Sequence, residues 1–258
     1  MEKNGVTGGM KMKKPKFVFF DYGQTLCTEL WEDPRRGYRR ILEAARENPH
    51  GVTEEELAAA FRRTDERLRR LSEDPWQTGP ELSWQAYARY TLESLDLAFD
   101  IGYQELEELC WYGCSDPTLP TEGIEDLLAF LRRAHIGYGV VSNLCFSERT
   151  LRKRLKKCLP QETFPLLMVS SAYAFRKPMA AFYELALHKA GAAPQEAWFC
   201  GDNAVCDVDG PAAVGMQGVW YTGAMSNPES LRLHPQREGW IEIQNWKDLE
   251  SLLGSLEG

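Results

Sequence analysis

Hydrophobic positions gather in short blocks along this chain, and the first block ends at a carboxylate. Residues 17–20 read Phe-Val-Phe-Phe, and Asp21 follows directly. Four consecutive large apolar residues are typical of a strand that is buried on both faces, as in a parallel sheet. We therefore predict a strand at 17–20 with Asp21 at its carboxyl end, which is where open α/β sheets place their chemistry.

From about residue 137 onward, short apolar blocks alternate with segments of helical periodicity. Strands are predicted at 138–141, 166–170, 198–201, 219–221 and 241–243. Helices are predicted at 179–190, which Gly191 would end, and at 246–253, which Gly254 would end. This alternation predicts strand-helix-strand units, and so an α/β fold with a doubly wound parallel sheet.

The region from residue 28 to residue 114 has a different pattern. It contains long amphipathic stretches and no convincing strand; the stretches lie at 38–46, 54–71, 82–95 and 103–111. Prolines fall between these stretches, where helices end. We therefore predict an α-helical cap at 28–114, inserted into a core made of 17–27 and 115–258. Residues 1–16 are predicted to be a mobile leader.

Composition narrows the class of protein. The chain has 258 residues and a formal net charge of −8, which argues against a general nucleic-acid binder. No window has the apolar length of a membrane span, and the first residues lack the apolar stretch of a secretory signal. The seven cysteines form no Cys-x-x-Cys pair, so free thiols in a reducing compartment are expected. We predict a cytoplasmic protein with neither membrane nor nucleic-acid partners, and the sequence leaves its oligomeric state open.

Polar side chains follow three more of the predicted strands, at the same edge of the sheet as Asp21. They are Ser142 and Asn143 after the second strand, Lys177 after the third, and Asp202 and Asp207 after the fourth. A hydroxyl can hold a phosphoryl oxygen, a lysine supplies positive charge, and carboxylates are preferred ligands of Mg²⁺. Each of these features alone is common in turns and helix caps. Together they predict a phosphate and cation site.

The ordered set of an Asp, a Ser, a Lys and an Asp pair resembles the four motifs of the haloacid dehalogenase-like (HAD) hydrolase superfamily. The resemblance covers nearly the whole chain from residue 17. It implies a Rossmann-like core and, because the insert follows the first motif, a helical cap of the type common in the phosphatases of this superfamily. It further implies Mg²⁺-dependent hydrolysis of a small phosphorylated metabolite.

The resemblance also implies roles for residues at matching positions. Asp21 would be the nucleophile that forms an aspartyl-phosphate, and Lys177 would stabilise the charge between nucleophile and phosphate. The substrate-binding positions would be Thr25, Ser142 and Asn143. The metal ligands would be Asp21, the backbone carbonyl of Gly23, Asp202 and Asp207, with Asp207 alternatively holding Lys177.

The sequence departs from the superfamily pattern at Gly23. Most phosphatases of the superfamily carry a second Asp at this position, which protonates the leaving alcohol and then activates water. The next residue also departs from the pattern, since Gln24 stands where a glycine is usual. Positioned proton transfer is typically worth about 10² to 10⁴ in rate. Hydrolysis of an alkyl phosphate should therefore be slow unless another group substitutes; the candidates are Tyr22, Glu29 and Glu32.

Three other interpretations fit the missing Asp. A haloacid dehalogenase lacks it too, but such an enzyme needs no Mg²⁺ and does not keep the Gly-Asp of the fourth motif, so Asp202 counts against dehalogenation. Phosphonoacetaldehyde hydrolase has a small residue there and uses a cap lysine, whereas residues 17–152 contain no lysine. A catalytically weak binding or regulatory protein is the principal alternative to a phosphatase.

Overall fold

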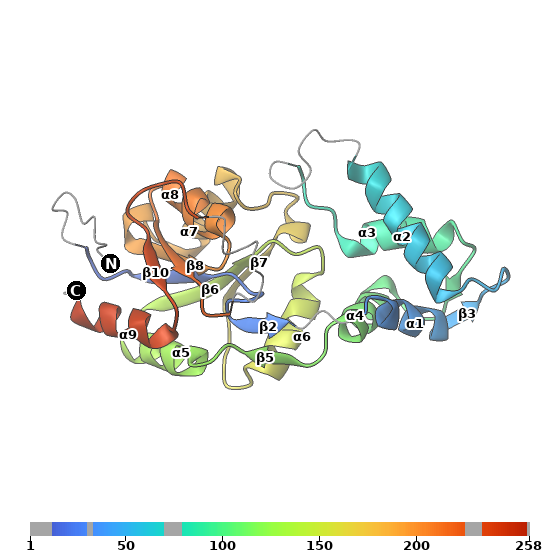
Figure 1. Cartoon of the computed structure of the whole chain (residues 1–258), viewed down its shortest axis with the longest axis horizontal. Coiled ribbons are helices and arrows are strands. Elements are labelled where there is room, and N and C mark those ends of the chain that lie inside the picture. The colour runs from blue at the N-terminus through green and yellow to red at the C-terminus, as the bar shows by residue number, and fades with distance from the viewer. Residues whose placement is uncertain (1–11, 30–32, 70–78, 225–233, 257–258) are drawn as a thin grey trace.

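A six-stranded parallel sheet forms the centre of the molecule's larger part (Figure 1). The computed structural model describes residues 12–29, 33–69, 79–224 and 234–256. The strands lie in the order β10 (Ile241–Ile243), β9 (Gln217–Tyr221), β8 (Ala197–Gly201), β1 (Phe17–Phe20), β6 (Gly137–Ser142) and β7 (Leu166–Val169). Every neighbouring pair is parallel. The predicted α/β fold with a doubly wound parallel sheet is confirmed.

Alternate side chains of β1 pack against helices on opposite faces of the sheet. Val18 and Phe20 belong to the hydrophobic cluster under α5 (Ile124–Arg133), α6 (Glu148–Cys158) and α9 (Trp246–Ser255). Phe19 belongs to the cluster under α7 (Ala180–Ala190), which lies on the other face together with the short α8 (Gly210–Ala213). All three side chains are fully buried. A continuous apolar run is what a strand covered on both faces requires.

Two helices were predicted to end at a glycine, and one of them does. Gly191 adopts the left-handed conformation with φ of +62° and ends α7, as predicted. The prediction that Gly254 ends the last helix is wrong, since α9 continues through it to Ser255. The φ of Gly254 is not positive, so the glycine provides no left-handed turn there.

The chain leaves the core after β2 (Cys27–Glu29) and returns through β5 (Thr118–Pro120), which pairs antiparallel with β2. Between them the described residues form α1 (Arg35–Glu43), α2 (Glu54–Arg69), α3 (Trp84–Glu93) and α4 (Tyr103–Cys114), with β3 (Ala45–Glu47) paired to β4 (Ala98–Phe99). The expectation of no strand between 28 and 114 is wrong. Strands of two or three residues are too short to show a period-two pattern. No helix in the described part of the chain is long and apolar enough to cross a membrane.

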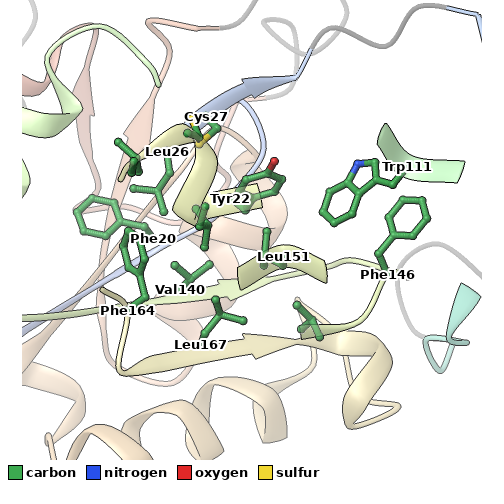
Figure 2. Packing of buried hydrophobic residues seen from close by; sticks show 14 of the residues in the cluster. Phe20, Tyr22, Leu26, Cys27, Trp111, Val140, Phe146, Leu151, Phe164 and Leu167 are labelled. Carbon is green, nitrogen blue, oxygen red and sulfur yellow. The ribbon is translucent and has the colours of Figure 1, made fainter. Parts of the chain in front are cut away.

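Aromatic rings fill the interior of the helical insert and continue into the core. The ring of Phe61 stacks on Tyr38 with centroids 5.0 Å apart and meets Tyr87 edge-on at 5.4 Å. Phe146, from the loop after β6, stacks on Trp111 of α4 at 4.5 Å (Figure 2). Such pairs stabilise beyond the area they bury, so Phe146 joins the insert to the core.

A buried carboxylate of the insert caps a helix of the core. Glu107 in α4 is fully buried and accepts hydrogen bonds from Ser147, at 2.8 Å from its N–H and 2.6 Å from its hydroxyl. It also accepts a hydrogen bond of 2.6 Å from the hydroxyl of Thr150. Ser147 is the N-cap of α6, where free N–H groups and the helix dipole favour a negative charge. The insert is thereby fixed to the start of α6.

We predict that Glu107→Ala lowers the free energy of unfolding by about 3 kcal/mol, because it removes the acceptor of the Ser147 N–H and leaves the hydroxyls of Ser147 and Thr150 with weaker bonds to Gln104 and to each other. The matched control is Glu108→Ala, the next residue of α4, whose ion pair with Lys153 lies near the surface at 2.7 Å. This control should cost about 0.5 kcal/mol. Urea denaturation measures both values, and equal losses would contradict the structural role of Glu107.

Candidate active site

Asp21 lies at the carboxyl end of the central strand. Its N–H donates a hydrogen bond of 2.9 Å to the carbonyl of Cys200 in β8, which fixes its backbone against the neighbouring strand. Because β1 lies between β6 and β8, the residues that follow those two strands lie on either side of Asp21. The topology thus brings Ser142 and Asp202 to the same edge of the sheet as Asp21.

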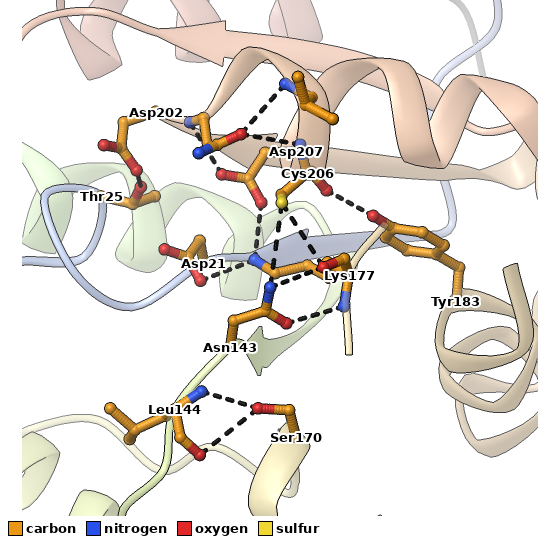
Figure 3. A network of polar contacts seen from close by, with 12 residues as sticks. Asp21, Thr25, Asn143, Leu144, Ser170, Lys177, Tyr183, Asp202, Cys206 and Asp207 are labelled. Carbon is orange, nitrogen blue, oxygen red and sulfur yellow. Dashed lines mark hydrogen bonds and ion pairs between the residues drawn. The ribbon is translucent and has the colours of Figure 1, made fainter. Parts of the chain in front are cut away.

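A buried lysine joins Asp21 to Asp207 (Figure 3). Lys177 is 2% exposed, and its Nζ donates to Asp21 Oδ1 at 2.8 Å and to Asp207 Oδ1 at 2.6 Å. Burial lowers the pKa of Lys177, but the attraction of Asp207 and Asp21 outweighs it, so the pKa is raised above its ordinary value. Lys177 therefore stays an ammonium and provides a permanent positive charge beside Asp21.

Three carboxylates lie close together around this lysine. Oxygen atoms of Asp21, Asp202 and Asp207 are all within 4.8 Å of one another. Burial raises the pKa of Asp202 well above its ordinary value, and the charges of Asp207 and Asp21 raise it further. Burial also raises the pKa of Asp207, to about 6, against the opposing effect of Lys177. The cluster holds more negative charge than one lysine neutralises, and its ligand set is one that a hard divalent cation prefers.

Asn203 holds the carboxylate of Asp207 in place. Its N–H donates to Asp207 Oδ2 at 3.0 Å. Its side-chain oxygen accepts hydrogen bonds from the N–H groups of Val205 and Cys206, at 3.1 and 2.9 Å, at the start of the π-helical turn η3 (Ala204–Asp209). Asn203 is absent from the residues predicted for the site, although an Asn between a strand and a helix is a typical N-cap signal.

Asn143 binds the backbone of Lys177 with both ends of its side chain. Its Nδ2 donates to the carbonyl of Lys177 at 2.8 Å, and its Oδ1 accepts from the N–H of Lys177 at 2.7 Å. This pair of bonds positions the loop that carries the ammonium, a role that was not predicted. Ser142 is buried at the end of β6. Contact of Ser142 and Asn143 with a phosphoryl group stays a prediction.

The loop that follows Asp21 is closed by its own backbone. The carbonyl of Tyr22 accepts hydrogen bonds from the N–H groups of Thr25, Leu26 and Cys27. Gln24 has φ of +54°, in the left-handed region that favours glycine. Thr25 is fully buried, and its hydroxyl lies 3.5 Å from Asp202 Oδ1. The loop therefore borders the carboxylate cluster, while phosphate binding by Thr25 stays a prediction, as does metal binding by the Gly23 carbonyl.

Two of the candidate substitute acids are held in a different cluster. The hydroxyl of Tyr22 donates to Glu29 Oε1 at 2.7 Å, and this oxygen lies 3.1 Å from Nη2 of Arg154. Burial raises the pKa of Tyr22 well above its ordinary value. The ring of Tyr22 meets Trp111 edge-on with centroids 6.0 Å apart (Figure 2). These contacts tie Tyr22 and Glu29 into a buried structural cluster, and Glu32 lies outside the described residues.

Comparison with protein families gives a match over most of the chain. The model of the haloacid dehalogenase-like hydrolases matches residues 15–215. The human haloacid dehalogenase-like hydrolase domain-containing protein 3 is 33% identical over 102 residues, which are 40% of this chain and 39% of the human protein. The match therefore spans well under half of that relative.

Solved structures share the fold over most of the chain. A HAD phosphatase from Thermococcus onnurineus has a TM-score of 0.59 and 21% identity, over 96% of this chain and 100% of that one. A 2-haloacid dehalogenase from Pseudomonas syringae pv. Tomato DC3000 has a TM-score of 0.61 and 19% identity, over 93% and 98%. A phosphatase and a dehalogenase thus have this same fold. Because the family model matches residues 15–215, the chain belongs to the haloacid dehalogenase-like hydrolases.

Proposed function

We propose that this hydrolase is a Mg²⁺-dependent phosphatase that acts on a small phosphorylated metabolite, with Asp21 as the nucleophile. The observation that carries the proposal is the cluster of Asp21, Asp202 and Asp207 around one buried ammonium. A dehalogenase that attacks a carbon–halogen bond needs no cation, so a cluster with excess negative charge favours the phosphatase. A phosphate ester is a substrate that such a site can bind together with a cation.

The residues of the cluster fit a hard divalent cation. Asp21, Asp202 and Asp207 each offer a carboxylate oxygen within 4.8 Å of the others, the spacing that one ion can bridge. Burial and mutual repulsion raise the pKa of Asp202, which is the charge imbalance that a cation relieves. Mg²⁺, when bound, would neutralise negative charge on the phosphoryl oxygens.

The chain's own residues provide the first step of the reaction. A carboxylate oxygen of Asp21 attacks phosphorus, and the bond from phosphorus to the leaving oxygen breaks as the new bond forms. Lys177, bound to Asp21 Oδ1 at 2.8 Å, orients the carboxylate and offsets the repulsion between two negative groups. Water then cleaves the aspartyl-phosphate, which releases inorganic phosphate and restores Asp21.

The leaving group determines which substrates this site can hydrolyse quickly. Gly23 offers no proton donor at the position where related phosphatases carry an acid, and Tyr22 and Glu29 are bound to each other. An alkoxide leaves slowly without a proton, whereas an aryl or acyl leaving group needs little protonation. We therefore propose that activated phosphates, aryl or acyl, are hydrolysed faster than alkyl phosphates.

We predict that Gly201→Ala weakens Mg²⁺ binding, because a Cβ there would lie 2.3 Å from the carboxylate of Asp207. Thermal unfolding with and without MgCl₂ is the measurement. The parent chain should gain about 2.7 kcal/mol at a Mg²⁺ concentration of about 100 times Kd, and the variant should lose most of that gain. The control is Gly254→Ala in α9, whose Cβ would meet nothing within 4 Å and which should keep the gain. If Gly201→Ala does not fold, Asp202→Asn replaces it. The full stabilisation by Mg²⁺ in whichever variant folds would contradict the proposed metal site.

We predict that Gly23→Asp raises kcat/KM for an alkyl phosphate such as glycerol phosphate by about 10² to 10⁴, because it installs a proton donor. The gain on an aryl phosphate such as p-nitrophenyl phosphate should be much smaller. Gly23→Asn, of the same shape without the acid, is the matched control. Steady-state kinetics with and without Mg²⁺ provide the measurement.

Asp21→Asn should abolish turnover both in the parent chain and in Gly23→Asp. Undiminished activity in Asp21→Asn would remove Asp21 from the mechanism. No gain in Gly23→Asp, combined with no Mg²⁺-dependent binding of a phosphate mimic, would favour the catalytically weak binding protein.

A further inference from the structure

Two cysteines from distant parts of the chain touch beneath the loop that follows Asp21. Cys27 begins β2, and Cys158 is the last residue of α6, 131 positions later. Their Sγ atoms lie 2.8 Å apart, and both cysteines are free thiols. We propose that Cys27 and Cys158 are a redox modification site, which a peroxide converts to a disulfide and a thiol reductant restores. The proposal does not depend on phosphatase activity.

The two thiols differ in their surroundings, which sets the order of their reactions. The hydrogen bond donated by Cys27 lowers the pKa of Cys158, and this effect outweighs partial burial and the charge of Glu125, which raise it; the guanidinium of Arg154 adds a smaller lowering effect. The same contact, together with burial, raises the pKa of Cys27. Cys158 is 8% exposed, whereas Cys27 is 0% exposed. Cys158 is therefore the thiol that ionises and meets the oxidant first.

Hydrogen peroxide would oxidise Cys27 and Cys158 in two steps. The thiolate of Cys158 attacks one peroxide oxygen, the O–O bond breaks, and a sulfenic acid and hydroxide form. The sulfur of Cys27 then attacks the sulfenic sulfur; the S–S bond forms, the S–O bond breaks, and water leaves with the thiol proton. The two sulfurs lose two electrons, the peroxide gains them, and two molecules of water result.

A second pair of neighbouring cysteines provides an internal comparison. Cys110 and Cys114 are four positions apart in α4. Residues at this spacing on a regular helix have Cβ atoms about 5 to 6 Å apart, whereas a disulfide needs about 3.5 to 4.5 Å. Oxidation of this pair would distort the helix. Cys27 and Cys158 come from different elements, so no helical spacing of this kind separates them.

The disulfide would restrain the loop of the candidate active site. The N–H of Cys27 donates to the carbonyl of Tyr22 at 3.1 Å, and the carbonyl of Cys27 accepts from the N–H of Gln24 at 2.8 Å. These bonds close the loop that carries Gly23 and Thr25. A covalent bond from Cys27 to α6 therefore anchors this loop to a helix of the core.

Peptide mapping by mass spectrometry tests the proposal. The full chain is treated with hydrogen peroxide, alkylated under denaturing conditions and digested. We expect two of the seven thiols to become resistant to alkylation and a linked peptide pair to contain Cys27 and Cys158. Dithiothreitol should reverse both changes. Cys158→Ser should lack the linked pair, and Cys114→Ser should retain it in full.

Two results would overturn the proposal. One is the absence of the linked pair at a peroxide concentration that oxidises free dithiothreitol; the other is an equal yield of linkage between Cys110 and Cys114. Cys158→Ala and Cys27→Ala replace the serine variant if a buried hydroxyl prevents folding. If either alanine variant still lost two thiols to a disulfide, as the parent chain does, the pairing of Cys27 with Cys158 would also be contradicted.

Discussion

The buried ammonium of Lys177 holds the candidate active site together. A buried charge is costly unless it is paired, and Lys177 is paired with Asp21 after β1 and with Asp207 in η3 after β8. Its backbone is fixed in turn by Asn143 after β6. Through its side chain and its backbone, Lys177 thus connects the loops that leave β1, β6 and β8. The same geometry leaves the cluster with more carboxylates than cations, which is the reason to expect a divalent metal.

The helical insert is fixed to the core by buried polar and aromatic contacts. Glu107 caps α6 from the insert, and Phe146 stacks on Trp111. Farther along α6, Arg154 binds Glu29 and also contacts Ser115 and Thr118, where the chain returns to the core. The helix α6 therefore links the helical insert, the loop after Asp21 and the sheet, and Cys158 lies at its end.

Much of the fold could be predicted from the sequence because the core strands are short continuous apolar runs. The same strand pattern predicted that Asp21, Lys177 and Asp202 would lie together, because each follows a strand and the ends of parallel strands meet at one edge of the sheet. Two- and three-residue strands such as β3 and β4 could not be predicted, because they show no periodicity. Neither could the partners of a side chain: Asn143 binds backbone, and Tyr22 binds Glu29, through packing that is formed only by the folded chain.

In the mechanism that we propose, Asp21, Lys177 and the two later carboxylates form one phosphoryl-transfer site. A crystal structure grown with MgCl₂ and beryllium fluoride, which mimics a phosphoryl group on a carboxylate, tests it most directly. We expect a beryllium fluoride adduct on Asp21, with Lys177 in contact and Mg²⁺ held among Asp21, Asp202 and Asp207. An adduct elsewhere, or a carboxylate cluster without the cation, would contradict it.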